Sequence, residues 1–164
     1  MKPSKRTLRA INRNWPKTLK MGEWAEQYVA ELYHENFFKE CPKPVFNKTK
    51  SHDFEFDTPE GGFKVEVKYD AAAKVYGNFC FEFRDHKGRD SGVIATQADI
   101  VIYVLDEHNV FEFNTKSLKR FVKKEISKSN SDIRKGGDNK AFDLLIVPIK
   151  RVEKFIFCTQ LEIH

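Results

Sequence analysis

The sequence predicts an α/β (α+β) domain with a central mixed sheet flanked by helices, and three observations lead to this fold class. A helix pattern with apolar residues at spacings of three and four comes first. Short strand-like runs follow, several of which alternate apolar and polar residues. A second helix pattern and a buried strand pattern come after them, so helices and strands are mixed along the chain.

The first helix is expected from about Thr18 to Phe38, and the sequence Cys41-Pro42-Lys43-Pro44 ends it because proline cannot continue a helix. Its apolar face consists of Trp24, Ala25, Tyr28, Val29, Leu32 and Tyr33. Strands are expected at residues 45–48, 53–57, 63–69, 78–84 and 100–105, with a short one at 110–113. Residues 58–62 have the composition of a turn, so the second and third of these runs should form a hairpin.

The second half of the chain is harder to assign. A helix with a basic outer face is expected from Ser117 to about Ser127, followed by a polar, glycine-containing loop at 128–140. Phe142 to Ile149 reads as a buried strand, and Pro148 marks its end or a sheet edge. Residues 152–163 fit a strand or a helix, and both remain open. All of these strands are expected in one mixed sheet.

The bulk composition bounds the class of protein. A chain of 164 residues with 15 phenylalanines is most simply one domain, here residues 18–164, with residues 1–17 as a basic N-terminal arm. No apolar run is long enough for a membrane span, and the basic N-terminus lacks the apolar segment of a secretory signal. Three cysteines without a CxxC spacing read as reduced thiols, so a cytoplasmic location is expected.

The net charge of +5 is unevenly distributed. Residues 1–20 carry +7 and residues 116–140 carry +6, which leaves −8 for the remainder. Two basic segments beside an acidic domain favour a polyanionic partner such as nucleic acid. The alternative is that both segments are solvated ends or loops.

Three charged residues are predicted to meet on one hairpin. In the run Val65-Glu66-Val67-Lys68 the valines should face a core, while Glu66 and Lys68 share the opposite face. Asp53 begins the preceding strand-like run, so the hairpin should bring it close to Glu66.

This set of groups suits a phosphodiesterase site. Two adjacent carboxylates repel each other and raise each other's pKa, and a divalent cation relieves the repulsion. Oxygen ligands suit Mg²⁺, with Mn²⁺ expected to substitute and no organic cofactor required. Lys68 could activate a water or stabilise charge on a phosphate. The alternative is a charged sheet surface with no site.

With these motifs the chain resembles the PD-(D/E)XK nuclease superfamily over roughly residues 20–105. That superfamily has an α-β-β-β-α-β core, with an acid at the start of the second strand and (Asp/Glu)-x-Lys in the third. Asp53 matches the first acid, and Glu66-Val67-Lys68 match the second element. The family often adds a glutamate on the first helix, for which Glu23 is the better match and Glu26 the reserve.

The resemblance implies a metal-dependent DNA endonuclease that hydrolyses phosphodiester bonds, with Asp53, Glu66 and Glu23 as metal ligands and Lys68 as a catalytic residue. Glu82 is expected to be a supporting acid or, equally, a sheet-face partner of Lys68 or Arg84. The small size favours selectivity for branched or junction DNA, as in a resolvase-like homodimer of a bacterial or phage-infected cell. A single-strand or end-processing nuclease, a non-catalytic nucleic-acid-binding module and a basic structural protein are the alternatives.

The basic segments supply candidate DNA contacts. Lys116 and four further cations of the second helix recur at spacings of three and four, so they share one face and should bind phosphates without reading sequence. The expected nucleic-acid-binding residues are Lys119, Arg120, Lys123 and Lys124 on this helix, and Arg134, Lys135 and Lys140 in the following loop. A solvated basic face is the alternative for the helix.

Overall fold

A computed structural model gives the fold and describes residues 19–47, 51–136, 140–155 and 158–160. The expected basic arm at 1–17 lies outside these residues. The helices are α2 (Leu19–Asn36), α3 (Ala71–Tyr76), α4 (Gly92–Ala95), α5 (Thr115–Ile126) and α6 (Ile149–Phe155). The strands are β1 (Val45–Phe46), β2 (Phe54–Thr58), β3 (Gly61–Tyr69), β4 (Asn78–Asp85), β5 (Ile100–Asp106), β6 (Asn109–Asn114), β7 (Ile133–Gly136), β8 (Phe142–Pro148) and β9 (Cys158–Gln160).

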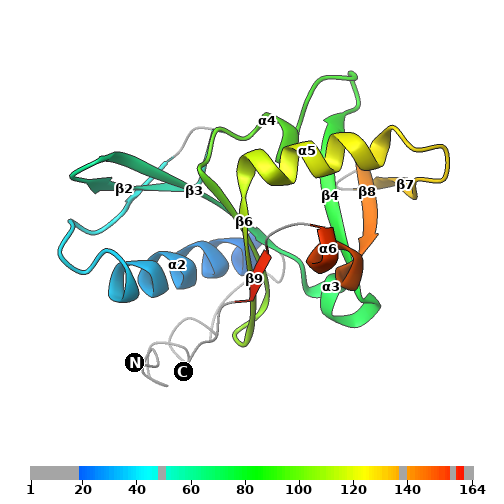
Figure 1. Ribbon diagram of the computed structural model, residues 1–164. Helices are drawn as coiled ribbons and strands as arrows, with labels where there is room; N and C mark the ends of the chain where they lie inside the picture. Colours follow the sequence, from blue (N-terminus) through cyan, green and yellow to red (C-terminus); the bar gives the residue numbers. More distant parts are fainter. Residues whose placement is uncertain (1–18, 48–50, 137–139, 156–157, 161–164) are drawn as a thin grey trace.

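The fold class is α+β, with a mixed sheet flanked by helices (Figure 1). The strand order of the main sheet is β1-β2-β3-β5-β6-β9, and β3 and β5 run parallel while the other neighbours are antiparallel. The predicted hairpin is confirmed, since β2 and β3 pair from Phe54↔Val65 to Thr58↔Gly61.

The prediction of a single sheet is wrong. The strand β4 does not join its predecessor β3 but pairs with β8, and β8 pairs with β7 in a separate three-stranded sheet. The short helix α3 makes this departure possible. Asp70 caps its start by accepting a hydrogen bond from the Ala73 amide, and Gly77 ends it in the left-handed conformation, with φ of 69°.

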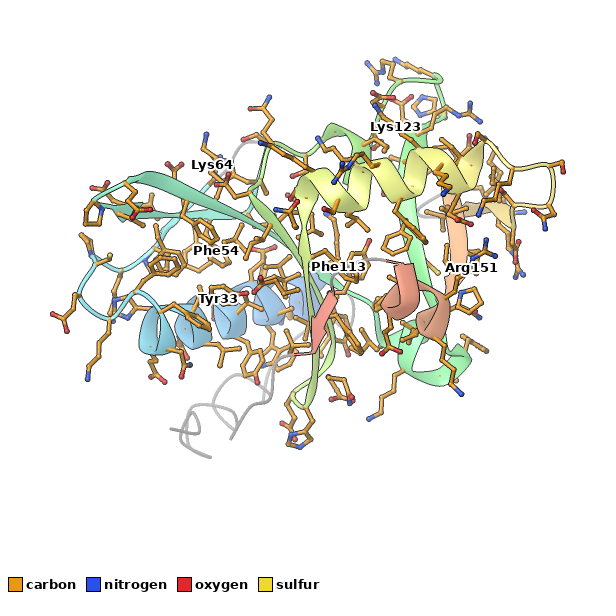
Figure 2. The ribbon with its side chains drawn as sticks, in the orientation of Figure 1. Tyr33, Phe54, Lys64, Phe113, Lys123 and Arg151 are labelled. Carbon is orange, nitrogen blue, oxygen red and sulfur yellow. The ribbon has the colours of Figure 1, made fainter. Side chains whose placement is uncertain are left out.

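The main sheet buries a different core on each of its faces. On one face, Val65 and Val67 pack with Phe54 and with the apolar stripe of α2. On the other face, Tyr103 and Phe113 pack with β4, β8 and α5. Figure 2 shows Phe54 between α2 and the β2–β3 hairpin, and Phe113 on β6 near the middle of the molecule. The alternation predicted for β3 therefore leaves Glu66 and Lys68 facing the second sheet.

Three further segments differ from the prediction. The expected loop at 128–140 contains strand β7, and the helices α3 and α4 were not predicted because each is too short to show a helical period. The ambiguous C-terminal segment contains both α6 and β9. By contrast, α5 and β8 lie within two residues of their predicted bounds.

No helix in the described ranges combines the length and the apolar character that a membrane crossing needs. Cys41 and Cys80 are half-buried free thiols, and the side chain of Cys158 lies outside the described residues. Burial, with the charge of Asp70 next in size, raises the pKa of Cys80 to about 11, so this thiol is protonated at neutral pH.

Candidate active site

Asp53 comes immediately before β2 and lies close to Glu66 of β3. The first residue pair of the β2–β3 hairpin is Phe54↔Val65, and the charge of Glu66 acts on the pKa of the neighbouring Asp53. Two hydrogen bonds fix the aspartate: its amide donates to the Val65 carbonyl at 2.9 Å, and its Oδ2 accepts from the Val67 amide at 2.6 Å. The proximity of Asp53 to Glu66 that the sequence predicted is therefore present.

Lys68 stands two residues further along the same face of β3 and forms an ion pair with Oε1 of Glu66. Glu66 is almost buried, at 7% exposure, and its Oε2 lies 3.4 Å from the Thr96 hydroxyl. Burial alone would lower the pKa of Lys68, but Glu66, Asp53 and Glu82 together outweigh burial and the pKa is raised. Lys68 is therefore a cation at neutral pH.

Burial and the charges of neighbouring acids raise the pKa of Asp53 and of Glu26. Burial and then the charge of Glu66 raise the pKa of Asp53, although the Val67 amide and Lys68 oppose the rise. Glu26 on α2 belongs to the same group of charges. Burial, and then the charges of Asp53 and Glu23, raise the pKa of Glu26 from 4.5 to about 7. Such mutual repulsion is what a bound cation removes.

The structure brings Glu26, rather than Glu23, into this group. Glu23 is exposed, whereas Glu26 is half-buried and its pKa responds to Asp53, Glu66 and Lys68. The helical phase does not separate the two residues, because the buried Ala30 follows Glu23 at seven residues and Glu26 at four. What distinguishes Glu26 is its partial burial and the effect of Asp53 and Glu66 on its pKa.

Asp53, Glu66 and Lys68 line an open cleft of about 780 Å³. The other lining residues come from the loop before β2, from β4, from the turn that follows β4, from α4 and from the start of β8: His52, Glu82, Asp85, His86, Arg89, Asp90, Ser91, Gly92, Ala95, Thr96, Ala141 and Phe142. Glu82 lines the same cleft, and its carboxylate accepts a hydrogen bond from the Ser91 hydroxyl. Of its two alternative partners, Arg84 binds Asp143 instead, whereas Lys68 is close enough for the charge of Glu82 to act on its pKa.

Two polar residues at the cleft were not singled out in the sequence. His52 is 6% exposed, and its ring lies within hydrogen-bond distance of the Ser51 hydroxyl and the Asn47 amide. Thr96 is buried below the cleft, and its hydroxyl also lies 3.1 Å from the Ser51 carbonyl. A lone histidine or threonine in a loop gives no sequence signal, because its role depends on contacts across the fold.

Gly92 allows α4 to pack directly against β4. Its φ is +49°, and a Cβ at this position would lie 2.5 Å from the Glu82 carbonyl oxygen. We therefore expect Gly92→Ala to destabilise the protein by about 2 kcal/mol or more and to displace Glu82 from the cleft wall. Urea denaturation measures the change.

Gly88 provides the matched control for Gly92. It also has a positive φ, of 77°, but a Cβ there meets no atom within 4 Å. Gly88→Ala should therefore cost only the strain of the left-handed conformation, about 1 kcal/mol. If Gly92→Ala and Gly88→Ala lower the free energy of unfolding equally, the close approach of Gly92 to Glu82 does not contribute to the loss of stability.

The basic face predicted for α5 is present beside the cleft. Lys116, Arg120, Lys123 and Lys124 are exposed on α5, whereas Leu118, Phe121 and Val122 on its other side are buried. Lys123 points outward in Figure 2. Lys119 is different, because its ammonium donates to the Thr96 carbonyl at 2.6 Å. This bond ties α5 to the residue whose hydroxyl touches Glu66.

Two of the three cations expected in the following loop are engaged elsewhere. Arg134 forms a two-point ion pair with Asp132, and Lys135 forms one with Asp143, which also binds Arg84. These pairs stabilise the β4-β8-β7 sheet and reduce the net charge available to a polyanion. Lys140 is exposed, with φ of 56°.

The donor set fits a divalent cation held by few protein ligands. Within the described ranges, no three histidine, cysteine or acidic side chains converge closely enough to coordinate a metal ion without further ligands. Asp53 and Glu66 provide two adjacent carboxylates, and Mg²⁺ is commonly bound by one or two carboxylates together with waters and substrate phosphate oxygens. Glu26 stands near enough to add its charge.

Comparison of the chain with protein families, curated proteins and solved structures gives no match. The fold and the cleft therefore define the class of site by themselves. It is an acidic pair with a paired lysine, in a cleft bordered by a basic helix.

Proposed function

We propose that the protein is a Mg²⁺-dependent DNA endonuclease of the PD-(D/E)XK type. The observation that carries the proposal is the proximity of Asp53 and Glu66, with Lys68 paired to Glu66, in the lining of one open cleft. A charged but idle sheet surface has no reason to bury Glu66 beside a second acid, because the burial and repulsion cost free energy.

The order of elements supports the same proposal. Helix α2 is followed by β1, β2 and β3, then by the short helices α3 and α4, and then by β5, which runs parallel to β3. With β4 taken as an addition between α3 and α4, this order is compatible with an α-β-β-β-α-β core. Asp53 comes immediately before β2, and Glu66 and Lys68 lie within β3, as the resemblance expects.

In this mechanism Asp53 and Glu66 would hold the metal, and the nearby charge of Glu26 would strengthen the attraction for the cation. A bound divalent cation supplies an activated water and polarises the phosphate. Lys68 is held as a cation by Glu66, so it donates hydrogen bonds to the phosphate oxygens as their negative charge grows in the transition state. Glu82 and Ser91 form the opposite wall and restrict how the phosphate enters. The product would carry a 5′-phosphate, as the resemblance implies.

DNA is the proposed substrate, and the cations next to the cleft would contact its backbone rather than its bases. The exposed lysines and arginine of α5 lie along a helix outside the cleft, and long flexible cations on such a face bind phosphates. Backbone contacts favour selection by DNA structure over selection by sequence. We therefore propose branched or junction DNA as the preferred substrate, cut by a homodimer that presents two sites to two strands.

A substrate panel tests this function. Supercoiled plasmid, a four-way DNA junction, linear duplex, single-stranded DNA and RNA are incubated with the full chain in Mg²⁺, in Mn²⁺ and in EDTA. We expect metal-dependent cleavage, fastest on the junction, and light scattering should show a dimer. Faster cleavage of single strands or ends would replace junction selectivity with the end-processing alternative. Binding of DNA without cleavage of any substrate would leave a non-catalytic binding module.

A further inference from the structure

The turn between β4 and α4 forms a rigid projection at the rim of the cleft. Figure 1 shows this segment rising above α4 and α5. Its backbone closes on itself, because the Asp85 amide donates to the Arg89 carbonyl at 2.9 Å and the Gly88 amide donates to the Asp85 carbonyl at 3.0 Å. Arg84 and Asp90 then bridge its base.

The carboxylate of Asp85 organises this turn from within. Its Oδ1 accepts from the amides of Lys87 at 2.8 Å and Arg89 at 2.9 Å, and its Oδ2 accepts from Nε and Nη2 of Arg89 at 2.8 and 2.6 Å. These bonds, that from the Arg89 amide foremost, lower the pKa of Asp85 to about 2. Asp85 is therefore ionised at neutral pH, and its carboxylate forms an ion pair with Arg89.

Arg89 is left with hydrogen-bonding capacity on its other edge. A guanidinium has five N–H donors, and Asp85 occupies the Nε edge, so the two Nη1 donors and the second Nη2 donor remain. The side chain is 67% exposed and lines the cleft together with Asp53, Glu66 and Lys68. A planar fork of this kind, fixed in place beforehand, matches the geometry of a phosphate.

Each of the two acids of the turn lies near a cation. Asp85 is neutralised by Arg89, and the second acid of the turn, Asp90, lies close enough to Lys119 of α5 to act on its pKa. Lys68 is already paired with Glu66 on the cleft floor. Among the residues that the structure describes, the cleft lining contains one lysine, Lys68, and one arginine, Arg89. The charge of Lys68 lies on the cleft floor, whereas that of Arg89 lies at the rim.

We propose that Arg89 is a phosphate-binding residue that holds a backbone phosphate adjoining the one that is cut, with Asp85 as its positioning residue. The inference rests on the proposed function and adds to it a second point of contact with the substrate. In this proposal the turn determines which phosphate of the substrate is positioned at Asp53 and Glu66.

The test compares Arg89→Met with Lys87→Met, a change of equal charge in the same turn at a residue that does not line the cleft. The probe is the fluorescein-labelled DNA that the wild type cuts fastest. We expect Arg89→Met to raise KM about tenfold with kcat within about threefold, and to reduce the slope of log affinity against log salt by about one. The KM of Arg89→Lys should lie between those of the wild type and Arg89→Met. The KM and the salt slope of Lys87→Met should match those of the wild type.

A second measurement keeps the wild-type protein and alters the DNA. Single neutral methylphosphonates are placed at each of the three phosphates on either side of the cut. One position should weaken wild-type binding about tenfold and have no further effect on Arg89→Met. Equal behaviour of Arg89→Met and Lys87→Met, with no such position, would overturn this inference alone. Failure of the wild type to cut any DNA would overturn the proposed function, and this inference with it.

Discussion

Lys68→Met is expected to slow phosphodiester cleavage by about 10²–10³-fold, because it removes the cation aimed at the developing charge on the phosphate. Lys68→Arg should cleave at least about tenfold faster than Lys68→Met, since arginine keeps the charge although its geometry differs. This ranking follows from the ion pair between Lys68 and Glu66, which holds the lysine in its charged form. Single-turnover rates in Mg²⁺ measure the effect.

The stability of each variant must be measured beside its rate. Loss of the lysine leaves Glu66 buried without its partner, which is destabilising. The double variant Glu66→Gln/Lys68→Met removes both charges and serves as the folded reference. Wild-type cleavage by Lys68→Met would exclude any role for the lysine in the reaction. Equal loss in Lys68→Met and Lys68→Arg would indicate instead that an uncharged lysine acts as a base.

Glu26→Gln is expected to have opposite effects on the metal-free and the metal-bound protein. With a pKa raised to about 7, ionised Glu26 opposes folding at pH 8, so Gln should stabilise the metal-free protein there by about 1–2 kcal/mol after allowance for partial exposure. The sign follows from the raised pKa: the penalty is present above pH 7 and disappears as the pH falls to 4.5. The same change should weaken Mg²⁺ binding by about tenfold or more.

Thermal unfolding at pH 8 and pH 5, with and without Mg²⁺, tests both effects. Glu31→Gln is the control, since Glu31 is exposed on the same helix. Glu23→Gln tests which glutamate of α2 acts at the metal site. The structure predicts that it changes stability and Mg²⁺ binding less than Glu26→Gln does, whereas the sequence pattern predicted a larger change. If Glu26→Gln is no more stable than the wild type at pH 8 without metal, the clustering of acids around Asp53 is wrong.

The part of the site that was predictable from the sequence depends on local pattern. Glu66 and Lys68 alternate with two valines, and a turn sequence returns the chain to Asp53, so strand periodicity and one hairpin fix the arrangement. The α5 helix was equally predictable, because its apolar and basic faces are well separated.

The features that the sequence did not predict depend on contacts between segments that are distant in the chain. Alternation along β4 showed that it is a strand, but not that it pairs with β8 rather than joining β3. The partial burial of Glu26 beside Asp53 and Glu66 depends on how α2 packs against the hairpin, which a short motif does not give. The role of Arg89 depends on how the turn after β4 is folded around Asp85 and where β4 places it, and neither has a periodic signature.

Nicking of supercoiled plasmid by the wild type and by Glu66→Gln, purified side by side, tests the central claim most directly. We predict that the wild type converts the plasmid to nicked and linear forms in Mg²⁺ and not in EDTA, and that Glu66→Gln does so at least about 10²-fold more slowly. Cleavage that survives unchanged in Glu66→Gln, or a wild type that is inert with both Mg²⁺ and Mn²⁺, would contradict the assignment of this cleft as a metal-dependent nuclease site.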